Sequence, residues 1–187
     1  MREMVARIVD GVLGKQAPAL QPSISPTSPT PAAVPTGTGI AIGADHGGFP
    51  LKERLAFRLR EQGHDVLDCG TDSSAAVDYP DFAHAVASAV AGGKAQWGIV
   101  VDGAGIGSAM VANKVPGIRA ALCYDLSSAR NSREHNHANI LTLGAALIGE
   151  GLAWQIVQEW LATEWGGDRH ARRVEKITEV ESRYLKA

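Results

Sequence analysis

Short apolar runs alternate with longer amphipathic stretches from residue 39 to the end of the chain. The runs have the length of buried strands, which we expect at residues 39–43, 65–69, 97–101, 118–122 and 139–143. Between them, apolar residues recur every three or four positions, which predicts helices at 48–62, 80–91, 107–113, 126–134, 149–163 and 169–184. Strands that alternate with helices predict an α/β domain, a three-layer Rossmann-like fold with a five-stranded parallel sheet.

The first 38 residues follow a different pattern. An apolar stripe runs along residues 1–15, which predicts a short amphipathic helix there. The stripe consists of Met4, Val5, Ile8, Val9, Val12 and Leu13. Residues 16–38 hold six of the nine prolines, separated by Ser, Thr and Ala, a composition typical of a disordered linker. We therefore expect a helix at 1–15, a linker at 16–38 and a folded domain at 39–187.

Composition and charge narrow the class of protein. The chain has 187 residues, of which 45% are hydrophobic and 20% charged, with a formal net charge of -2. This balance, without a long run of Lys or Arg, argues against a general nucleic-acid binder. Cys69 and Cys123 lack redox or metal-site spacing, which indicates a reducing, cytoplasmic environment and no bound metal. No stretch approaches the roughly 20 apolar residues of a membrane span.

Polar residues follow the expected strands, at the sheet edge where parallel α/β folds bind ligands. Asp45 and His46 follow the first strand, and Asp102 with the turn 103–107 follows the third. Further candidates lie in REHNHAN (133–139) and at the start of the last helix, GDRHARR (167–173). We expect all of these groups to converge on the carboxyl edge of the sheet.

The glycine turn has two interpretations. Gly103 and Gly105, with Asp125 twenty residues after the second glycine, imitate a dinucleotide-binding fingerprint. Ser108 replaces the third fingerprint glycine, however, and the Pro-Gly pair at 116–117 ends the following helix early. The other interpretation is a set of backbone N–H groups at a helix N-terminus that stabilises a developing oxyanion. We favour the second.

These motifs resemble those of the type-B ribose-5-phosphate isomerases and the related galactose-6-phosphate isomerase subunits. The matching segments are GADHGG, DYPDFA, ANKVPGIRAALC, REHNHANILTLG and RHARRVEKI, in this order over residues 39–184. The resemblance implies a five-stranded parallel α/β fold, and a homodimer or homotetramer with its active site at the subunit interface. It also implies an aldose–ketose isomerase without cofactor or metal, acting on a sugar phosphate of the ribose 5-phosphate/ribulose 5-phosphate type through an enediolate.

The resemblance also assigns roles to residues. His135 matches the histidine that opens the sugar ring, a role that suits a group titrating near neutral pH. Arg169 and Arg173, four residues apart on one helical face, match the residues that bind the substrate phosphate. The residues implied to contact the sugar are Asp45, His46 and Asn136. The residues expected to hold the enediolate oxygen are Gly103, Ala104, Gly105, Ile106 and Gly107.

Three of these assignments have a purely structural alternative. Asp45 and His46 could be a helix cap or a surface pair. His135 could simply end its helix, where a histidine interacts favourably with the helix dipole. Arg169 and Arg173 could belong to a solvated basic face that pairs with Glu175 and Glu179.

Five positions depart from the family pattern. Asp102 stands where many members carry the cysteine base, and Ala104 where they carry threonine. Ser108 stands where a subgroup has glutamate, Ala146 where the family has another phosphate arginine, and His137 where Asp or Asn is more usual. We expect Asp102 to act as the base; alternatively it only caps the next helix. A tetrose or deoxypentose phosphate as substrate, or a catalytically idle sugar-phosphate-binding or scaffold protein, remain alternatives.

The N-terminal extension resembles the encapsulation peptides that carry cargo enzymes into bacterial microcompartments. The apolar stripe of residues 1–15 would bind shell or cargo proteins. A membrane-surface helix and an oligomerisation tail are the alternatives, and the lack of any aromatic residue before Phe49 disfavours the membrane. We therefore expect a cytoplasmic protein inside a microcompartment, bound to no nucleic acid and no membrane.

Overall fold

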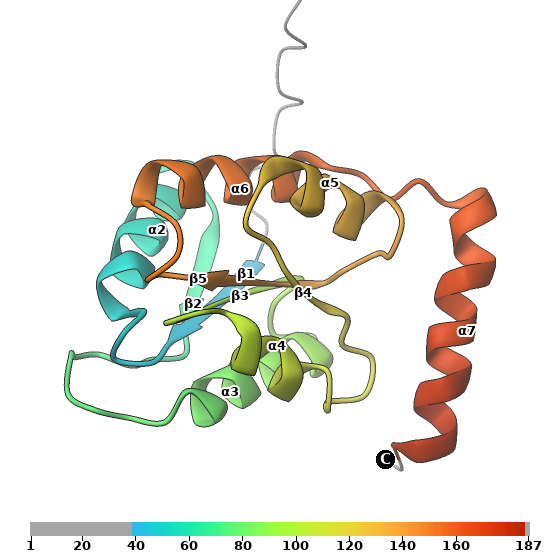
Figure 1. Ribbon diagram of the computed structural model, residues 1–187, viewed down its shortest axis with the longest axis horizontal. Coiled ribbons are helices and arrows are strands. Elements are labelled where there is room, and N and C mark those ends of the chain that lie inside the picture. Colours follow the sequence, from blue (N-terminus) through green and yellow to red (C-terminus); the bar gives the residue numbers. More distant parts are fainter. Residues whose placement is uncertain (1–38, 186–187) are drawn as a thin grey trace, which may run out of the picture. The chain divides into compact units, whose positions relative to one another are not determined.

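The computed structural model describes residues 39–185, so the helix expected at 1–15 and the linker at 16–38 lie outside the described residues (Figure 1). The strands are β1 (Gly39–Ala44), β2 (Asp65–Asp68), β3 (Trp97–Asp102), β4 (Ala120–Leu122) and β5 (Ile140–Gly144). The helices are α2 (Phe49–Glu61), α3 (Tyr79–Ala91), α4 (Ile106–Ala112), α5 (Leu126–Glu134), α6 (Glu150–Ala162) and α7 (Asp168–Tyr184). The expected strands and helices of the domain are all present, with boundaries within two residues of those predicted.

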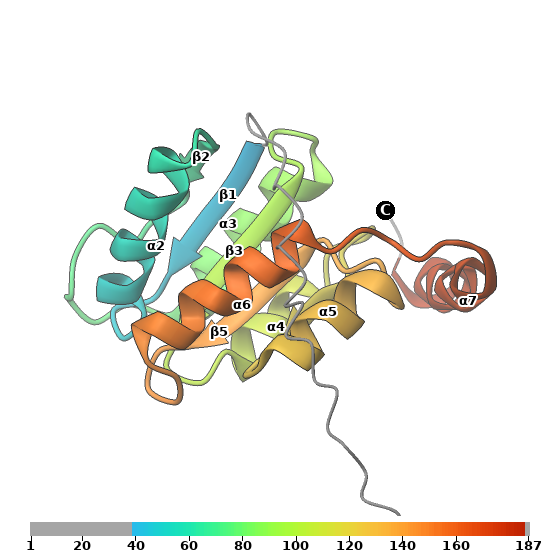
Figure 2. The same cartoon turned by 90° about the horizontal axis from the view of Figure 1, so that it is seen from above.

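The five strands form one parallel sheet in the order β2-β1-β3-β5-β4, which confirms the predicted fold class. Figure 2 shows β1, β3 and β5 side by side and pointing the same way. The chain steps from β1 outward to β2 and then returns to β3 on the other side of β1. Sheets of this kind bind ligands in the crevice at the carboxyl ends of the two strands where the order reverses. In this sheet the two strands are β1 and β3. Asp45 directly follows the last residue of β1, and Asp102 is the last residue of β3.

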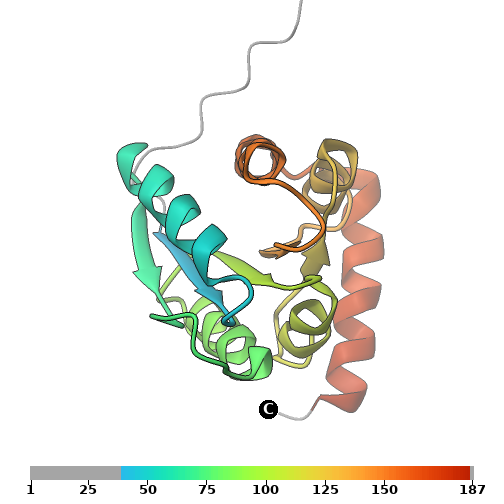
Figure 3. The same cartoon turned by 60° about the vertical axis from the view of Figure 1, so that its left-hand side comes forward.

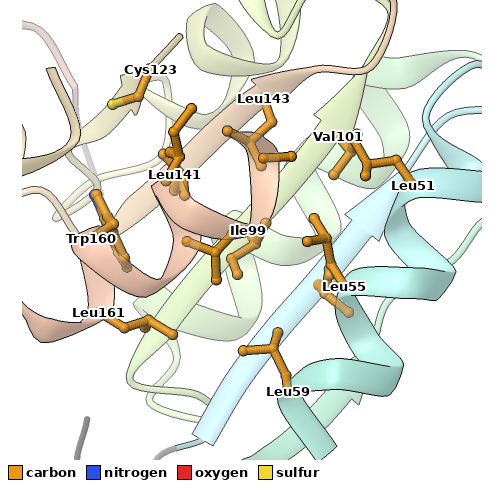
Figure 4. Close-up of a cluster of buried hydrophobic side chains, with 14 of the residues drawn as sticks. Leu51, Leu55, Leu59, Ile99, Val101, Cys123, Leu141, Leu143, Trp160 and Leu161 are labelled. Carbon is orange, nitrogen blue, oxygen red and sulfur yellow. The ribbon is translucent and has the colours of Figure 1, made fainter. Parts of the chain in front are cut away.

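Helices α2, α5 and α6 cover one face of the sheet, and α3 and α4 cover the other (Figure 1). Side chains alternate along each strand, so Ile99 and Val101 of β3 face the first group of helices while Val100 faces the second. Figure 4 shows the first of these two core layers, where Leu55 of α2 and Trp160 of α6 pack over the sheet. The two apolar layers fix the sheet and thereby the strand ends that carry the polar residues.

Helix α7 stands to one side of these layers, on the side of α5 and β4 (Figures 1 and 3). Of its side chains, which the structure describes in full, only His170 and Val174 are buried. Ile177, Val180 and Tyr184, spaced three and four residues apart, are 45%, 54% and 79% exposed. An exposed apolar stripe of this kind is typical of a surface that another chain covers. Within residues 39–185, the helices lack the combination of length and apolarity that crossing a bilayer requires.

Candidate active site

The carboxylate of Asp102 is the centre of the polar groups at the carboxyl edge, and the residue is only 5% exposed. Its Oδ1 accepts the backbone N–H groups of Ala104, at 2.8 Å, and of Gly105. Its Oδ2 accepts the backbone N–H of Ser108, at 3.1 Å, and the Ser108 hydroxyl. These are the contacts of a capping side chain, since they satisfy N–H groups that the start of α4 leaves free. In this structure Asp102 therefore fills the concave side of the glycine turn.

Residues outside the turn 103–107 fix its backbone conformation. Gly105 has a φ of 76°, and a Cβ there would lie 2.5 Å from a methyl carbon of Leu122, so only glycine fits without strain. The phenol of Tyr124 donates a hydrogen bond of 2.7 Å to the Ala104 carbonyl. Gly107 faces the ring of Tyr79, which a Cβ would approach to 2.5 Å. The sequence alone assigned no role to either tyrosine, although Tyr124 lies only two residues after β4.

Asp45 and His46 lie beside this turn. The backbone N–H of Asp45 donates to the Val101 carbonyl at 3.3 Å, and its Oδ1 accepts from the backbone N–H of Gly48 at 2.8 Å. The Nδ1 of His46 lies 3.0 Å from the carbonyl oxygen of Val77, and its ring is exposed. The structure thus brings Asp45, His46, Asp102 and the turn 103–107 together, a group we call the carboxyl-edge half-site.

The other predicted site residues lie at the opposite edge of the sheet, and these are His135, Asn136, Arg169 and Arg173. Helix α5 starts beyond the carboxyl end of β4 and brings the chain back to the start of β5. There the Ala138 N–H donates to the Ser132 carbonyl at 2.9 Å, and the Asn139 N–H to the Arg119 carbonyl at 3.1 Å. The prediction that all candidates converge on one edge is therefore wrong, because α5 runs back along the sheet to its amino edge before His135 appears.

At this amino edge the residues form a second cluster. The ring of His135 stacks on that of His170 with centroids 4.2 Å apart, and its Nδ1 lies 2.9 Å from the side-chain amide of Asn131. Arg169 Nε donates to His170 Nε2 at 3.0 Å. The Asn136 side chain donates to the Asn131 carbonyl at 3.3 Å. We call these five residues, together with Arg173 one turn further along α7, the amino-edge half-site.

Two members of the amino-edge half-site, Asn131 and His170, were not predicted. Asn131 stands four residues before His135 on α5, a spacing that places both side chains on one helical face. His170 lies inside the RHARR motif from which only the arginines were taken. Both signals were therefore present in the sequence.

The electrostatics of the two half-sites differ. Desolvation lowers the pKa of His170, and the positive charges of His135, Arg169 and Arg173 lower it further. The ion pairs among residues 39–185 do not join Arg169 or Arg173 to Glu175 or Glu179. The guanidinium of Arg173 and the terminal amino groups of Arg169, whose Nε donates to His170, can therefore bind an anion. The carboxyl-edge half-site instead carries two carboxylates.

The length of β3 separates the half-sites within one chain, since six residues rise roughly 20 Å. Each half-site therefore lacks the groups that the other carries. Among residues 39–185, His, Cys, Asp and Glu side chains do not gather in threes that could hold a metal ion.

Comparison with known proteins places this geometry in context. The family model described as Ribose/Galactose Isomerase matches residues 40–177. The chain is 47% identical to ribose-5-phosphate isomerase B of Escherichia coli (strain K12) over 144 residues, which are 77% of this chain and 97% of that protein. It is 45% identical to a D-erythrulose-4-phosphate isomerase of Pectobacterium atrosepticum over 139 residues, which are 74% of this chain and 91% of that protein.

A solved structure agrees with these matches. Ribose-5-phosphate isomerase B of Clostridium thermocellum is 52% identical, with a TM-score of 0.77 over 78% of this chain and 98% of that chain. The family model covers most of the chain, and the matched span includes both half-sites. The protein is therefore an isomerase of the aldose–ketose class and belongs to the ribose/galactose isomerase family.

Proposed function

We propose that the protein interconverts an aldose phosphate and a ketose phosphate, of the ribose 5-phosphate/ribulose 5-phosphate type, through an enediolate and without a cofactor. The observation that carries this proposal is the carboxylate of Asp102, buried at the end of β3 and bound by the backbone N–H groups of Ala104, Gly105 and Ser108. It stands at the position of the family's base. The names of the relatives, ribose-5-phosphate isomerase B above all, support this substrate class.

The proposed chemistry moves one proton between two neighbouring carbons, through Asp102, and a second proton between their oxygens. Asp102 removes the proton from the carbon next to the carbonyl, and the electron pair of the broken C–H bond forms the enediolate double bond. The carbonyl oxygen becomes an oxyanion, while Asp102 becomes neutral. The N–H groups of Gly103, Ile106 and Gly107, which do not donate to Asp102, can then stabilise the substrate oxyanion. The hydroxyl proton on the carbon that lost its hydrogen then moves to the oxyanion, and the proton held by Asp102 is delivered to the former carbonyl carbon. The carbonyl now lies on the first carbon, which completes the isomerisation.

The amino-edge half-site supplies the remaining functions. His135 opens the sugar ring by giving and taking a proton, and Arg169 and Arg173 bind the phosphate with charge-assisted hydrogen bonds. Asn136, with Asp45 and His46 of the carboxyl-edge half-site, binds the sugar hydroxyls. Within residues 39–185, Glu175 and Glu179 form no ion pair with Arg169 or Arg173, which supports the role of these arginines in binding the phosphate.

A single chain cannot bring the two half-sites to one substrate, so we propose a homodimer or homotetramer with the active site between subunits. The acidic half-site of one subunit would meet the basic half-site of the next, and charges of opposite sign favour that pairing. The exposed stripe Ile177, Val180 and Tyr184 on α7 supplies an apolar surface for the same contact. Sedimentation of the full chain at micromolar concentration tests this, and a monomer that retains turnover would contradict it.

A shorter sugar is the second candidate substrate. Ala146 stands where the family has a further phosphate arginine, and its backbone N–H donates to the Gly103 carbonyl at 3.0 Å. The missing cation would therefore have stood beside the turn and Asp102. A relative named D-erythrulose-4-phosphate isomerase supports a tetrose phosphate. A panel of C4, C5 and C6 sugar phosphates decides between them by kcat/KM.

The test of the proposed base is Asp102→Asn. Asparagine keeps an oxygen that can accept the N–H groups of Ala104 and Gly105, so the fold should survive, while the base is lost. We expect turnover and exchange of the carbon-bound hydrogen with solvent to fall ~10²–10⁴-fold. The melting temperature should fall modestly, because the amide NH2 cannot accept the Ser108 N–H that Oδ2 accepts in the wild type. Comparable turnover in the variant would show that Asp102 is only a cap. A wild-type protein that binds but neither isomerises nor exchanges would be an idle binder.

We further propose that residues 1–15 carry the enzyme into a bacterial microcompartment by binding shell or cargo proteins, so that it works in the cytoplasm inside that shell. The support is the apolar stripe Met4, Val5, Ile8, Val9, Val12 and Leu13 and the Pro-rich composition that follows it. Deletion of residues 1–36 should abolish co-assembly with shell proteins while turnover stays unchanged. Equal encapsulation of the truncated and full chains would contradict this.

A further inference from the structure

The carboxylate of Asp102 has no free acceptor position in the resting structure. An ionised carboxylate offers about four lone-pair sites on its two oxygens. Oδ1 accepts from Ala104 and Gly105, and Oδ2 accepts twice from Ser108, once from the backbone and once from the hydroxyl. A base that must take a proton from carbon needs one of these sites to be vacated.

Three of the four donors are backbone N–H groups that cannot move alone. The peptide between Ala104 and Gly105 is tied through its carbonyl to the phenol of Tyr124, and Gly105 is packed against Leu122. The N–H of Ser108 belongs to the first turn of α4. The fourth donor, the Ser108 hydroxyl, sits on a side chain with three staggered χ1 positions. It is the donor that can leave Asp102 without any movement of the backbone.

We infer that Ser108 is a positioning residue whose hydroxyl is the exchangeable fourth donor to Asp102. This rests on the proposed function of Asp102 as the base. With the hydroxyl in place, Oδ2 is held and its negative charge stabilised. Rotation of χ1 frees one lone pair of Oδ2, and a serine in a helix can then donate to the carbonyl three or four residues earlier, here Gly105 or Ala104.

The freed lone pair receives the proton of the substrate carbon. The C–H bond breaks, an O–H bond forms on Oδ2, and the C–H electron pair becomes the enediolate double bond, so no oxidant or other reactant is needed. When the proton leaves Asp102 for the neighbouring carbon, the hydroxyl returns to Oδ2. Ser108 itself touches neither the reacting carbon nor its proton, since it is fully buried beneath the turn.

The experiment compares Ser108→Ala with Ser132→Ala in the full chain. Both serines are buried in helices. The hydroxyl of Ser132, on α5, donates to the Ala129 carbonyl and accepts from the indole N–H of Trp160 on α6. Each variant therefore loses one buried hydroxyl, but only Ser108→Ala loses a donor to Asp102. The titration midpoint of the Asp102 carboxyl group is followed through the 13C chemical shift of its carboxyl carbon, and Asp102→Asn serves to assign the signal. The pH dependence of kcat/KM is measured on the best sugar phosphate of the panel.

Removing a donor from a charged carboxylate disfavours its charged form, so Ser108→Ala should raise the Asp102 midpoint by roughly 1–2 pH units. The acid limb of kcat/KM should shift by the same amount, with KM nearly unchanged, while Ser132→Ala leaves both curves in place. An unmoved midpoint in a folded Ser108→Ala variant would overturn the inference. A raised midpoint in a protein that isomerises no sugar phosphate would support the Ser108–Asp102 coupling and overturn the proposed reaction instead.

Discussion

The imidazole rings of His135 and His170 stack with their centroids 4.2 Å apart and their planes 10° from parallel. His135 directly follows α5 and His170 lies in the first turn of α7, so the stack fixes the start of α7 against the end of α5. Arg169 extends the stack by its hydrogen bond to His170. His170 thus links the proposed ring-opening group to the proposed phosphate anchor, so each group needs a test of its own that the other would not affect.

Replacing His135 by Asn should slow isomerisation of a pentose 5-phosphate by ~10²–10⁴-fold, because such sugars are mostly closed rings that need an acid–base group to open. A tetrose 4-phosphate has no free hydroxyl on carbon 4 and cannot close a five-membered ring. Its turnover should therefore fall far less in the same variant. Steady-state kinetics on both sugars provide the measurement, and equal losses would assign His135 to the fold or the subunit contact rather than to ring opening.

Replacing Arg173 by Gln should weaken binding of a phosphosugar by roughly ten- to a hundredfold, because a charge-assisted hydrogen bond is lost. Arg169→Gln should do the same and also lose the bond to His170. Arg172→Gln is the matched control, since Arg172 is exposed on the same helix. Binding of the unphosphorylated sugar should hardly change in any variant. If phosphorylated and free sugars lose affinity equally, the arginines do not hold the phosphate.

The strands and helices of the domain were predictable because their apolar periods are unambiguous, and the departure at Asp102 was visible in the sequence. The prediction that all candidate residues converge on one edge of the sheet was wrong, although the order of elements contained the signal. A residue that follows a strand lies at the carboxyl edge, whereas one that follows the next helix, such as His135, has returned to the amino edge. The tie between Tyr124 and Ala104 depends on the fold of the turn, so no sequence period could reveal it.

Arg133 should contribute to stability through its flat guanidinium group. It is 5% exposed, lies 3.8 Å from the ring centroid of Trp97 and donates to the Ala138 carbonyl at 2.7 Å. Desolvation lowers its pKa to about 10, helped by Arg119. Lysine cannot stack in this way, so Arg133→Lys should lower the free energy of unfolding by about 1–3 kcal/mol in urea titrations.

The matched control for Arg133→Lys is Arg130→Lys, on the same helix. Arg130 is exposed and pairs with Glu159 at 2.7 Å. Exchanging cations in an exposed pair should change the free energy of unfolding by less than about 0.5 kcal/mol. Equal effects of the two substitutions would show that stacking on Trp97 adds nothing.

His137 should make the fold less stable in mild acid. Its ring stacks on Trp165 with centroids 4.2 Å apart. Desolvation lowers its pKa below the ordinary 6.5, and the charges of Arg119 and Arg133 lower it further. The unfolded chain therefore takes up the proton first as the pH falls, and stability is lost below about pH 6.5. Melting temperatures between pH 7.5 and 5 should show this loss.

The substitution that isolates this effect is His137→Asn. His137 has a φ of 51°, a left-handed conformation that asparagine adopts more readily than most residues, and asparagine does not titrate. At pH 7.5 the variant should be the less stable protein, because the stack on Trp165 is lost. Towards pH 5 the difference in melting temperature should shrink or reverse, since only the wild type takes up the extra proton on unfolding. Replacing the exposed His84 by Asn should leave the pH dependence unchanged. Parallel pH curves for His137→Asn and the wild type would mean that protonation of His137 does not drive the loss, and that another histidine, such as the buried His170, does.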